Sequence, residues 1–437
     1  MPTTDTGPRA DLLAGVVVLD FTLAAVGPFC SRVLADLGAE VVHVEWPRYR
    51  WGGASVGDEE TRFSRALISE PGERGSQLFL HTNGGKRSLS VNLKEPDGVA
   101  LVKAMIPSVD VVVENMTPRV MRNFGLDYDA LSAINPGLVM CSLTGFGQDG
   151  LDGDLARSCT DPVAQAMSGI SWITGERDGV PYAVGGGLGD SVTSMTGVAA
   201  ILAALYGRQA TGRGQFIDIA MVEALAYVDC TALPEALMSG RETVFRNGQQ
   251  GSYTFPMGPF RATGGYVAIQ APGAGAESPW GRLCLLMGRT DMIDDPRYET
   301  DYVRLDHCDD VIAAVEAWLC SFDDVETPLV LLGAERISSG PVLAQRDMPA
   351  HPYFVARGTF TEVEYPDVGP VTVMRPPFRF SGAEARVRGV APEMGEGGRE
   401  VAMELAGLTA DEVEDLHRRG VLYESEGARR RRGPLPA

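Results

Sequence analysis

One carboxylate, Asp190, stands behind four glycines in the stretch "GGGLGDSVTS" at residues 185–194. Because glycine has no side chain, nothing next to this carboxylate shields it from a ligand carbonyl. The run "MTGVAAILAALYGR" predicts a helix to about Gly207, so Asp190 lies near a helix amino terminus. There the helix dipole favours an ionised, nucleophilic carboxylate, and neighbouring N–H groups can hold an oxyanion. An ordinary helix N-cap is the alternative interpretation of Asp190.

A second polar pair, Thr160-Asp161, stands 30 positions before Asp190. Asp161 either assists Asp190 or caps the helix predicted for "DPVAQAMSG", with Pro162 at its first position. The sequence holds no GxSxG nucleophile elbow, and none of its five histidines has a supporting motif. If this chain is an enzyme, a carboxylate is therefore the expected reactive group.

Basic residues recur near the ends of predicted strands. They are Lys86, Arg87 and Lys94 in "NGGKRSLSVNLK", Arg48 and Arg50 after the second strand, and Arg119 and Arg122 after "VVVENMTP". Open α/β sheets bind ligands beyond the carboxyl ends of their strands. We therefore expect these loops to bring positive charge to one edge of the sheet, where it suits an extended polyphosphate. For the cluster at 83–94, a solvated face and a phosphate site both remain open.

The elements that position these residues follow an alternating pattern. "GVVVLDFT" (15–22) predicts a buried strand, "GPFCSRVLADLGAE" a helix, and "EVVHVEW" a second strand. Further strands at 86–93, 110–115 and 138–147 alternate with helices, which indicates a doubly wound α/β layer with a parallel sheet. The first turn, "TLAAVGP", lacks the GxGxxG of dinucleotide-binding folds, which disfavours a nicotinamide-dependent oxidoreductase.

The length and composition suggest more than one domain. We expect a large domain over 1–225, a small α+β domain over 231–335, and a return segment with the C-terminal tail over 336–437. The glycine-rich segment 246–266 is either a long surface loop or an active-site lid. The run "RRRR" at 429–432 predicts a disordered, solvated end.

The bulk composition excludes several classes of protein. The formal net charge of −20 argues against nucleic acid as a partner. No unbroken apolar run reaches the length of a membrane span, and the first residues contain no secretory h-region. The seven cysteines are scattered and never spaced CxxC, which indicates a reducing cytoplasm without structural zinc. We expect a cytoplasmic chain with no membrane partner, no metal and no permanently bound cofactor.

Blocks along nearly the whole chain carry a family resemblance. They are "GVVVLDFTLAAVGP", "LADLGAEVVHVE", "NGGKRSLSVNLKEPDG", "VDVVVENMTPRVMRNFGLDY", "INPGLVMCSLTGFGQDG", "GLGDSVTSMTGVAAILAALYGRQATGRGQFIDIAM" and "GPFRATGGYVAI". In this order they resemble the class III coenzyme A transferases of the CaiB/BaiF type. That family includes formyl-CoA transferase and carnitine CoA-transferase-like enzymes, with the α-methylacyl-CoA racemases as relatives. The resemblance implies a large Rossmann-like domain joined to a small domain, and an interlocked homodimer.

The resemblance also implies a site and a reaction. Asp190 matches the catalytic aspartate, which attacks an acyl-CoA, forms a mixed anhydride and then an aspartyl-CoA thioester, and passes CoA to a free carboxylic acid. Candidate assisting residues are Thr160, Asp161, Ala25 and Gly189. The expected CoA contacts are Leu23, Ala24, Val26, Arg48, Val91, Lys94, Asn115, Met116 and Arg122. The loop expected to cover the site carries Gly248, Gly251 and Gly258.

Departures from the family refine the hypothesis. The racemases have a histidine where Thr160 stands, and threonine exchanges no proton near neutral pH, which favours transfer over racemisation. The formyl-CoA enzymes carry Tyr-Glu at 160–161, a glutamine at Ala25 and a histidine at Leu23, so we expect a roomier, more apolar acyl pocket here. The family has an arginine beside the adenosine of CoA where this chain has Trp46, and Arg48 is the candidate that takes over its role. The family's arginine near position 123 is also missing here, and Arg119 or Arg122 is the candidate for that role. A racemase and a non-catalytic CoA-binding protein remain the alternatives.

Overall fold

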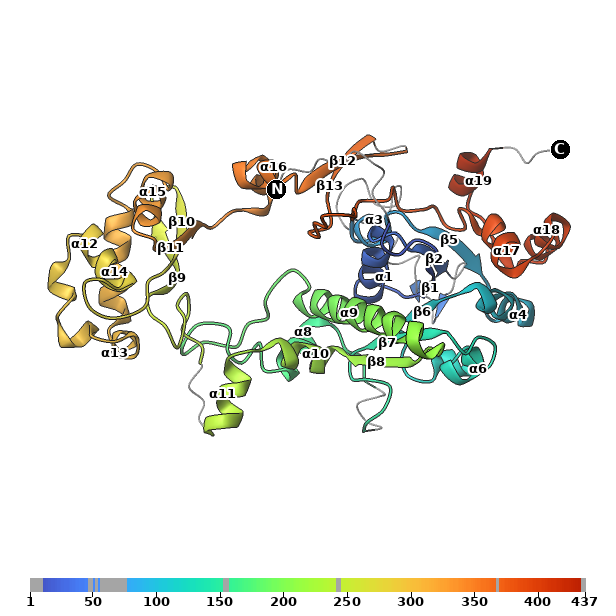
Figure 1. Ribbon diagram of the computed structural model, residues 1–437, viewed down its shortest axis with the longest axis horizontal. Coiled ribbons are helices and arrows are strands. Elements are labelled where there is room, and N and C mark those ends of the chain that lie inside the picture. Colours follow the sequence, from blue (N-terminus) through green and yellow to red (C-terminus); the bar gives the residue numbers. More distant parts are fainter. Residues whose placement is uncertain are drawn as a thin grey trace. The chain divides into compact units, whose positions relative to one another are not determined.

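The computed structural model describes residues 11–45, 50–51, 54–55, 77–151, 157–240, 245–366 and 369–433. The chain forms two compact units (Figure 1). Unit 1 comprises Met1–Ala164, Gly187–Leu225 and Pro352–Ala437, and unit 2 comprises Gln165–Gly186 and Ala226–His351. Unit 2 thus includes the segment 165–186, which sequence patterns alone did not set apart. The domain borders at 225, 231 and 335 remain predictions.

Unit 1 is built on a seven-stranded sheet in the order β14-β5-β2-β1-β6-β7-β8. The strands are β1 Val17–Phe21, β2 Glu40–Glu45, β5 Arg87–Val91, β6 Val111–Glu114, β7 Val139–Thr144, β8 Phe216–Ala220 and β14 Leu422–Tyr423. All pairs are parallel except β14 with β5. The predicted parallel α/β layer is confirmed. Strand order reverses between β1 and β6, and in such sheets ligands bind at the carboxyl ends of the strands at this point.

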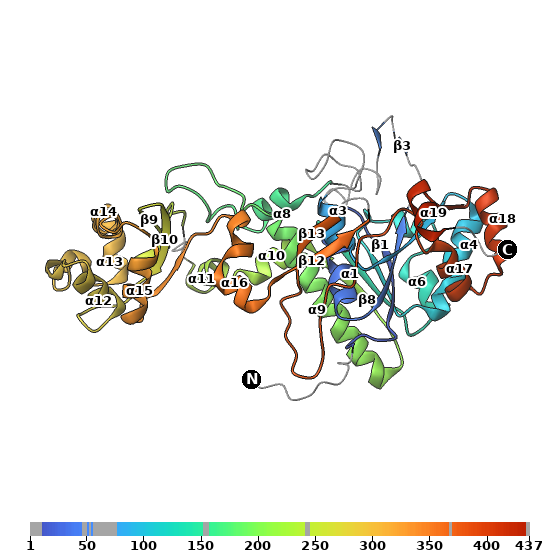
Figure 2. The same cartoon turned by 90° about the horizontal axis from the view of Figure 1, so that it is seen from above.

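Helices cover both faces of this sheet. The helices that lie wholly or partly in unit 1 are α1 Val26–Asp36, α3 Gln77–Asn83, α4 Pro96–Met105, α5 Val120–Asn123, α6 Tyr128–Ser132, α8 Asp161–Met167, α9 Leu188–Thr211, α10 Met221–Val228, α16 Pro352–Arg357, α17 Gly398–Ala406, α18 Ala410–Arg418 and α19 Glu426–Arg432. On one face α4 and α17, about 300 residues apart in sequence, pack together over a core that includes Leu89, Val112 and Met140 (Figures 1 and 2). α8 and α10 each cross from one unit into the other.

The other face carries α1 and α9, which pack against each other. A side chain at Gly27 would place its Cβ 2.3 Å from Thr22 Cβ, so only glycine lets α1 begin this close to the end of β1. α9 runs past the predicted end at Gly207 to Thr211, where Gly212 closes it in the left-handed conformation (φ 67°). Among the described residues, α9 is the one helix that is long and apolar enough to span a membrane. It packs instead on α1, β7 and β8.

The C-terminal segment returns to unit 1 and completes its sheet. It contains the hairpin β12 Phe360–Tyr365 and β13 Gly369–Met374, and it ends on β14 and α19. The predicted disordered arginine end is wrong for residues 426–432, because Ser425 caps α19 and its arginines find carboxylates from elsewhere in the fold. Arg431 Nη1 lies 2.9 Å from Glu396, and Arg432 Nε lies 2.8 Å from Glu424. Glu396 lies 35 positions before Arg431, so this pair is invisible in the local sequence.

Unit 2 has a three-stranded antiparallel sheet and its own helices. The elements are α11 Ala232–Ser239, β9 Met257–Ala262, β10 Gly265–Gln270, α12 Pro279–Leu286, α13 Asp301–Leu305, α14 Cys308–Leu319, α15 Glu326–Ala334 and β11 Ser338–Pro341, with sheet order β11-β10-β9. Arg304 is fully buried in its core, where it donates to Phe255 O and Gly273 O and lies over the Trp280 ring. This satisfied guanidinium organises the centre of the unit.

Candidate active site

Asp190 lies in the first turn of α9, after the N-cap rather than at it. The N-cap is Gly187, in the left-handed conformation (φ 68°) and without a side chain that could cap the helix. The N-cap interpretation of Asp190 is therefore wrong. A Cβ at Gly187 would stand 3.4 Å from Asp190 Oδ2, so this glycine provides both the backbone conformation and the open space beside the carboxylate.

Asp161 caps α9 from the neighbouring helix α8. Its Oδ1 accepts a hydrogen bond from Gly189 N at 2.5 Å, and so satisfies one of the free N–H groups at the start of α9. A Cβ on Gly189 would come within 2.7 Å of the same oxygen, which excludes any larger residue. The Gly189 N–H is therefore engaged by Asp161 rather than free for an oxyanion. Thr160 precedes α8, and its carbonyl accepts from Val163 N and Ala164 N.

The pKa of Asp190 is raised to about 6, because burial disfavours its charge and Asp161 adds a like charge nearby. Because Asp190 lies near a helix amino terminus, we expected its pKa to be lowered. The loss of solvation on burial outweighs the effect of the helix dipole here. At pH 7 the carboxylate remains mostly ionised, because that pH lies above its pKa. A charged, partly desolvated carboxylate in a cleft is the kind of group that acts as a nucleophile.

The carboxyl ends of β1 and β6 are tied together beside Asp190. Asn115 Oδ1 accepts from Leu23 N at 2.8 Å, and Asn115 Nδ2 donates to Leu23 O at 2.8 Å. This pair holds the turn whose next residue, Ala24, has a left-handed φ of 64°. Glu114 accepts from Met116 N at 2.8 Å on the other side. The amide of Asn115 therefore positions the turn at the point where the strand order reverses.

A cavity of about 390 Å³ opens at Asp190. Of the predicted site residues it brings together Ala24, Ala25, Val26, Asn115, Met116, Thr160, Asp161 and Asp190. Sequence reasoning missed several neighbours, which include Leu143, Phe146, Arg157, Cys159 and Met221. Leu143 lies near the end of β7, Phe146 follows that strand and Met221 follows β8, so the rule that placed ligands beyond strand ends would have found these three had it been applied to these strands.

Other predicted contacts lie elsewhere. Val91 is fully buried in β5 and Lys94 is exposed just beyond it. Arg119 and Arg122 line a different cavity of about 700 Å³. Arg122 Nε lies 3.0 Å from Asp127, and this cavity carries five carboxylates in all, so the expected basic edge is not formed there. Arg48 falls outside the described residues.

The glycines of the predicted lid, Gly248, Gly251 and Gly258, belong to unit 2. Their loop is held together internally, since Gly251 N donates to Met257 O and Gln249 Nε2 donates to Pro259 O. A Cβ on Gly258 would lie 1.9 Å from Gln249 O. The glycines therefore allow a tight fold of the loop, and its role as a lid remains a prediction.

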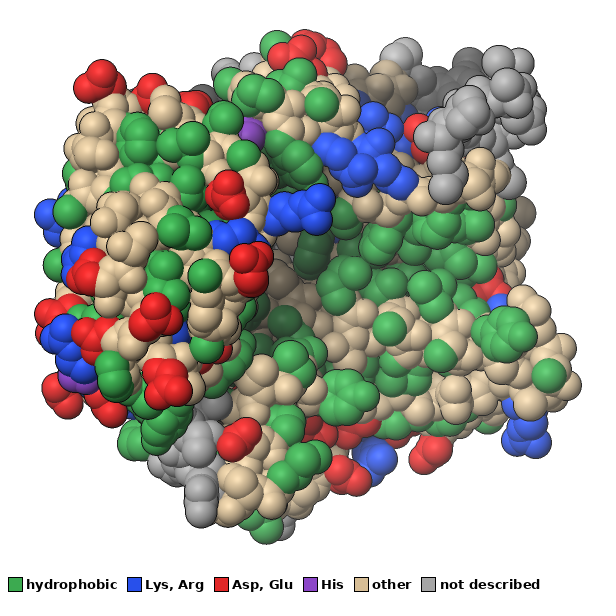
Figure 3. Space-filling view, turned by 60° about the vertical axis from the view of Figure 1, so that its left-hand side comes forward, with side chains coloured by type: hydrophobic (Ala, Val, Ile, Leu, Met, Phe, Trp, Pro, Cys, Tyr) green, Lys and Arg blue, Asp and Glu red, His purple; other side chains and the backbone are tan. Residues whose placement is uncertain are grey.

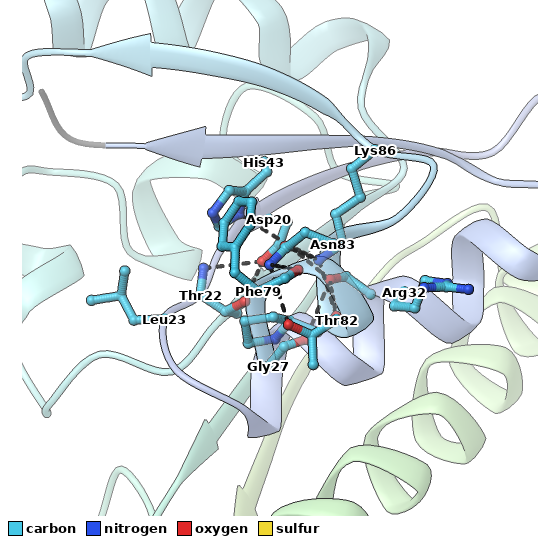
Figure 4. A network of polar contacts seen from close by, with 12 residues as sticks. Asp20, Thr22, Leu23, Gly27, Arg32, His43, Phe79, Thr82, Asn83 and Lys86 are labelled. Atoms are coloured by element: carbon cyan, nitrogen blue, oxygen red, sulfur yellow. Dashed lines mark hydrogen bonds and ion pairs between the residues drawn. The ribbon is translucent and has the colours of Figure 1, made fainter. Parts of the chain in front are cut away.

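The basic cluster at 83–94 is split by the fold, and Lys86 is part of a buried network (Figure 4). Lys86 Nζ donates to Asp20 Oδ2 at 2.8 Å, to Asn83 Oδ1 at 2.7 Å and to Pro28 O at 3.0 Å. Both charged side chains are fully buried. Neither a phosphate site nor a solvated face therefore describes Lys86. It precedes β5 and Lys94 follows it, so the two lie at opposite ends of one strand.

The same network fastens the turn that lines the Asp190 cavity. Asp20 also accepts from Thr22 N at 3.0 Å and from Ser31 Oγ at 2.6 Å, and His43 Nδ1 lies 3.3 Å from it (Figure 4). Ser194 Oγ of α9 donates to Val26 O at 2.5 Å. The end of β1, the start of α1 and the helix that carries Asp190 are thereby joined. Arg87, outside this network, pairs with Glu40 and Glu404.

The described part of the chain holds no cluster of three or more His, Cys, Asp or Glu side chains arranged for a metal ion. The groups that line the cavity are the carboxylates of Asp190 and Asp161, one guanidinium, and a mixture of apolar and uncharged polar side chains. This arrangement suits attack by Asp190 on an electrophilic acyl carbon.

Comparisons with known proteins give one consistent answer. The sequence model of CoA-transferase family III matches residues 13–397. The chain is 31% identical over 414 residues to succinyl-CoA–D-citramalate CoA-transferase of Chloroflexus aurantiacus, covering 94% of this chain and 98% of that protein. It is 32% identical over 404 residues to succinate–glutarate CoA-transferase of Agrobacterium fabrum, covering 92% and 98%.

A solved structure agrees with the sequence matches. The crystal structure of a CaiB/BaiF family protein from Brucella suis superposes with a TM-score of 0.77 at 31% identity, covering 90% of this chain and 99% of that one. The family match over most of the chain, the agreement in fold and the carboxylate site lead to one conclusion: this chain belongs to CoA-transferase family III and is an enzyme of the acyl-CoA:carboxylate CoA-transferase class.

Proposed function

We propose that this enzyme moves CoA from an acyl-CoA to a free carboxylic acid with Asp190 as the covalent carrier. The observation that carries the proposal is the position of Asp190. Its carboxylate faces a cavity of about 390 Å³ at the carboxyl ends of the strands, and the N–H of the preceding glycine is held by Asp161. Burial strengthens electrostatic interactions and excludes water that would hydrolyse an activated acyl group.

The steps follow from a carboxylate nucleophile. Asp190 attacks the thioester carbon, the C–S bond breaks, and a mixed anhydride and a CoA thiolate result. The thiolate attacks the aspartyl carbonyl of the anhydride, the donor acid leaves as a carboxylate, and an aspartyl-CoA thioester remains. The acceptor carboxylate then runs the same steps in reverse. Each step exchanges one acyl bond for another, and neither a metal nor a redox cofactor takes part.

The proposal assigns roles to the surrounding residues. The turn from Leu23 to Val26, fixed by Asn115, contacts the pantetheine end of CoA together with Met116. Lys94, exposed beyond β5, and Arg48 contribute positive charge toward its phosphates. The loop with Gly248, Gly251 and Gly258 closes over the site.

A racemase is the weaker reading of the same site. Racemisation needs a second group that exchanges a proton at the α-carbon, and Thr160 cannot supply it near neutral pH. Deuterium uptake at the α-carbon of an α-methylacyl-CoA, with no acid added, would favour the racemase.

The proposal extends to substrate class and assembly. The two relatives named above act, by their names, on succinyl-CoA or succinate with citramalate or glutarate, which are dicarboxylic acids. We propose dicarboxylic acids for this enzyme as well.

Its seven cysteines form no disulfides, which suits the cytoplasm.

Exposed apolar side chains suit a second copy of the chain and a homodimer. α11 buries none of its residues, and many apolar side chains are exposed at the surface (Figure 3). The large ones on helices α9, α10 and α11 are Met195, Tyr206, Tyr227, Val228, Leu233, Leu237 and Met238. Large apolar patches of this kind mark protein interfaces.

An isotope-exchange assay tests the catalytic role. Wild-type enzyme is incubated with succinyl-CoA and labelled succinate, and label entering the CoA ester is followed. We expect exchange for wild type and none for Asp190→Ala. The matched control is Asp218→Ala, which removes another carboxylate whose pKa is raised by burial but which lines the second cavity. An Asp190→Ala enzyme that exchanges label at the wild-type rate would refute the proposal.

A further inference from the structure

The C-terminal return segment of unit 1 lines a further cavity, of about 320 Å³. Among the described residues that line it, three are arginines, Arg357, Arg375 and Arg379, and one is a carboxylate, Glu384. The cavity shares no lining residue with the Asp190 cavity. The chain as a whole has a formal net charge of −20, so this cavity concentrates the opposite charge.

The turn from α16 into β12 brings two of these arginines together (Figure 1). α16 ends at Arg357, and Gly358 follows it in the left-handed conformation (φ 56°). β13 pairs back along β12, and just beyond it Arg375 N donates to Thr359 O at 2.8 Å. A Cβ at Gly358 would lie 3.9 Å from Arg375 Nη1, so this guanidinium lies beside the end of α16.

The charges in this cavity are not balanced by its own side chains. Arg375 Nη2 lies 3.4 Å from Glu384 Oε1, and both side chains are partly exposed. Three guanidiniums that line one cavity repel each other, and one carboxylate offsets only part of that repulsion. An anion with two or more charges would offset the rest. Guanidinium groups suit phosphate oxygens in particular, because their planar fork of N–H donors matches the geometry of a phosphate.

Aromatic rings form another part of the lining, with Tyr353, Phe354, Phe378 and Phe380. The rings of Phe378 and Phe380 lie 6.3 Å apart between centroids and 30° from parallel. Tyr353 and Phe380 are 59% and 39% exposed. Exposed rings offer a flat apolar surface on which a planar base can stack. A dicarboxylate or inorganic phosphate would leave this surface uncovered, whereas a nucleotide would cover it.

We propose that this cavity binds a nucleoside diphosphate, with its base against the aromatic rings and its phosphates among the three arginines. The volume lies at the lower end of the range of about 300–1,000 Å³ that small-molecule sites occupy, which suits a free mononucleotide rather than a whole CoA molecule. The inference does not depend on CoA transfer at Asp190, because the two cavities have no residue in common.

Calorimetric titration of the full-length enzyme with ADP tests the proposal. We expect wild type to bind ADP, and the double variant Arg357→Gln with Arg379→Gln to bind it about 10- to 100-fold more weakly, as for the loss of hydrogen bonds to a charged group. The matched control is Arg346→Gln, at an arginine that is 88% exposed and lies outside the cavity lining, and it should bind ADP as wild type does.

Two further titrations separate the parts of the site and the sources of the ligand. CoA itself carries an ADP group, so each variant is also titrated with CoA, and its affinity should be unchanged. Phe380→Ala should weaken binding of ADP but not of pyrophosphate, because pyrophosphate has no base to stack on the ring.

Four results would overturn the inference. Wild type that binds no ADP, or a double variant that binds it as wild type does, would exclude a nucleotide from this cavity. An equal loss of CoA affinity in the double variant would mean that the arginines serve CoA. Equal weakening of ADP and pyrophosphate by Phe380→Ala would exclude a stacked base. A change of molar mass in light scattering, confined to the double variant, would mean that a second copy of the chain covers the arginines.

Discussion

Replacing Lys86 by methionine should destabilise unit 1 strongly. The ammonium group makes three hydrogen bonds of 2.7–3.0 Å, and both it and the carboxylate of Asp20 are fully buried. Lys86→Met keeps a similar length of side chain but leaves the Asp20 charge without its main counterion. Removing one partner of such a pair costs about 3–5 kcal/mol of unfolding free energy, because the other charge stays buried.

Hydrogen exchange measured by mass spectrometry suits this prediction. Peptides from β1, which carries Asp20, should open with a free energy lower by that amount, while peptides from β10 in unit 2 provide an internal control. Lys94→Met removes an exposed lysine from the other end of β5 and should change stability by less than about 0.5 kcal/mol. Asp20→Asn combined with Lys86→Met removes the orphaned charge and should recover about 2 kcal/mol of the loss.

The reasoning fails if Lys86→Met and Lys94→Met give the same opening free energy in β1. It also fails if the double variant is less stable than Lys86→Met by the full cost of a second, independent substitution, because the two side chains would then not be coupled.

Three further predictions concern the site. Because burial and Asp161 raise the pKa of Asp190 to about 6, kcat/KM should rise tenfold per pH unit below pH 6 and level off above it, as a pH–rate profile would record. Asp161→Asn removes the like charge and keeps an acceptor for Gly189 N, so the midpoint of that profile should move to lower pH; an unmoved midpoint would contradict the role given to Asp161. Asn115→Ala removes both hydrogen bonds to Leu23 and should raise KM for acyl-CoA about tenfold while kcat changes less. An unchanged KM would show that these two hydrogen bonds do not shape the CoA site.

Much of the fold of unit 1 could be read from the sequence because its information is local. A buried parallel strand such as "VVLDF" or "VVVE" is apolar on both faces, and the glycines and prolines between the runs mark where helices begin. The blocks around Asp190 pointed to the correct family, and the position of Asp190 at the start of a helix followed from four glycines and the helical run behind them.

The rest depended on contacts that no local pattern contains. The sequence left a solvated face and a phosphate site open for Lys86 and Arg87, yet Lys86 meets Asp20, 66 positions away, and Arg87 meets Glu404, 317 positions away. Arg431 behaves likewise with Glu396. The direction of the Asp190 pKa shift also depended on tertiary burial. A helix dipole can be predicted from an element boundary, but desolvation cannot.

Trapping the covalent intermediate tests the central claim most directly. The enzyme is mixed with an acyl-CoA in the absence of an acceptor acid, digested under acidic conditions and examined by mass spectrometry. We predict that the peptide containing Asp190 carries CoA, with loss of one water, and that Asp190→Ala carries none. CoA bound covalently at any other residue, or turnover by Asp190→Ala without an adduct, would contradict the account.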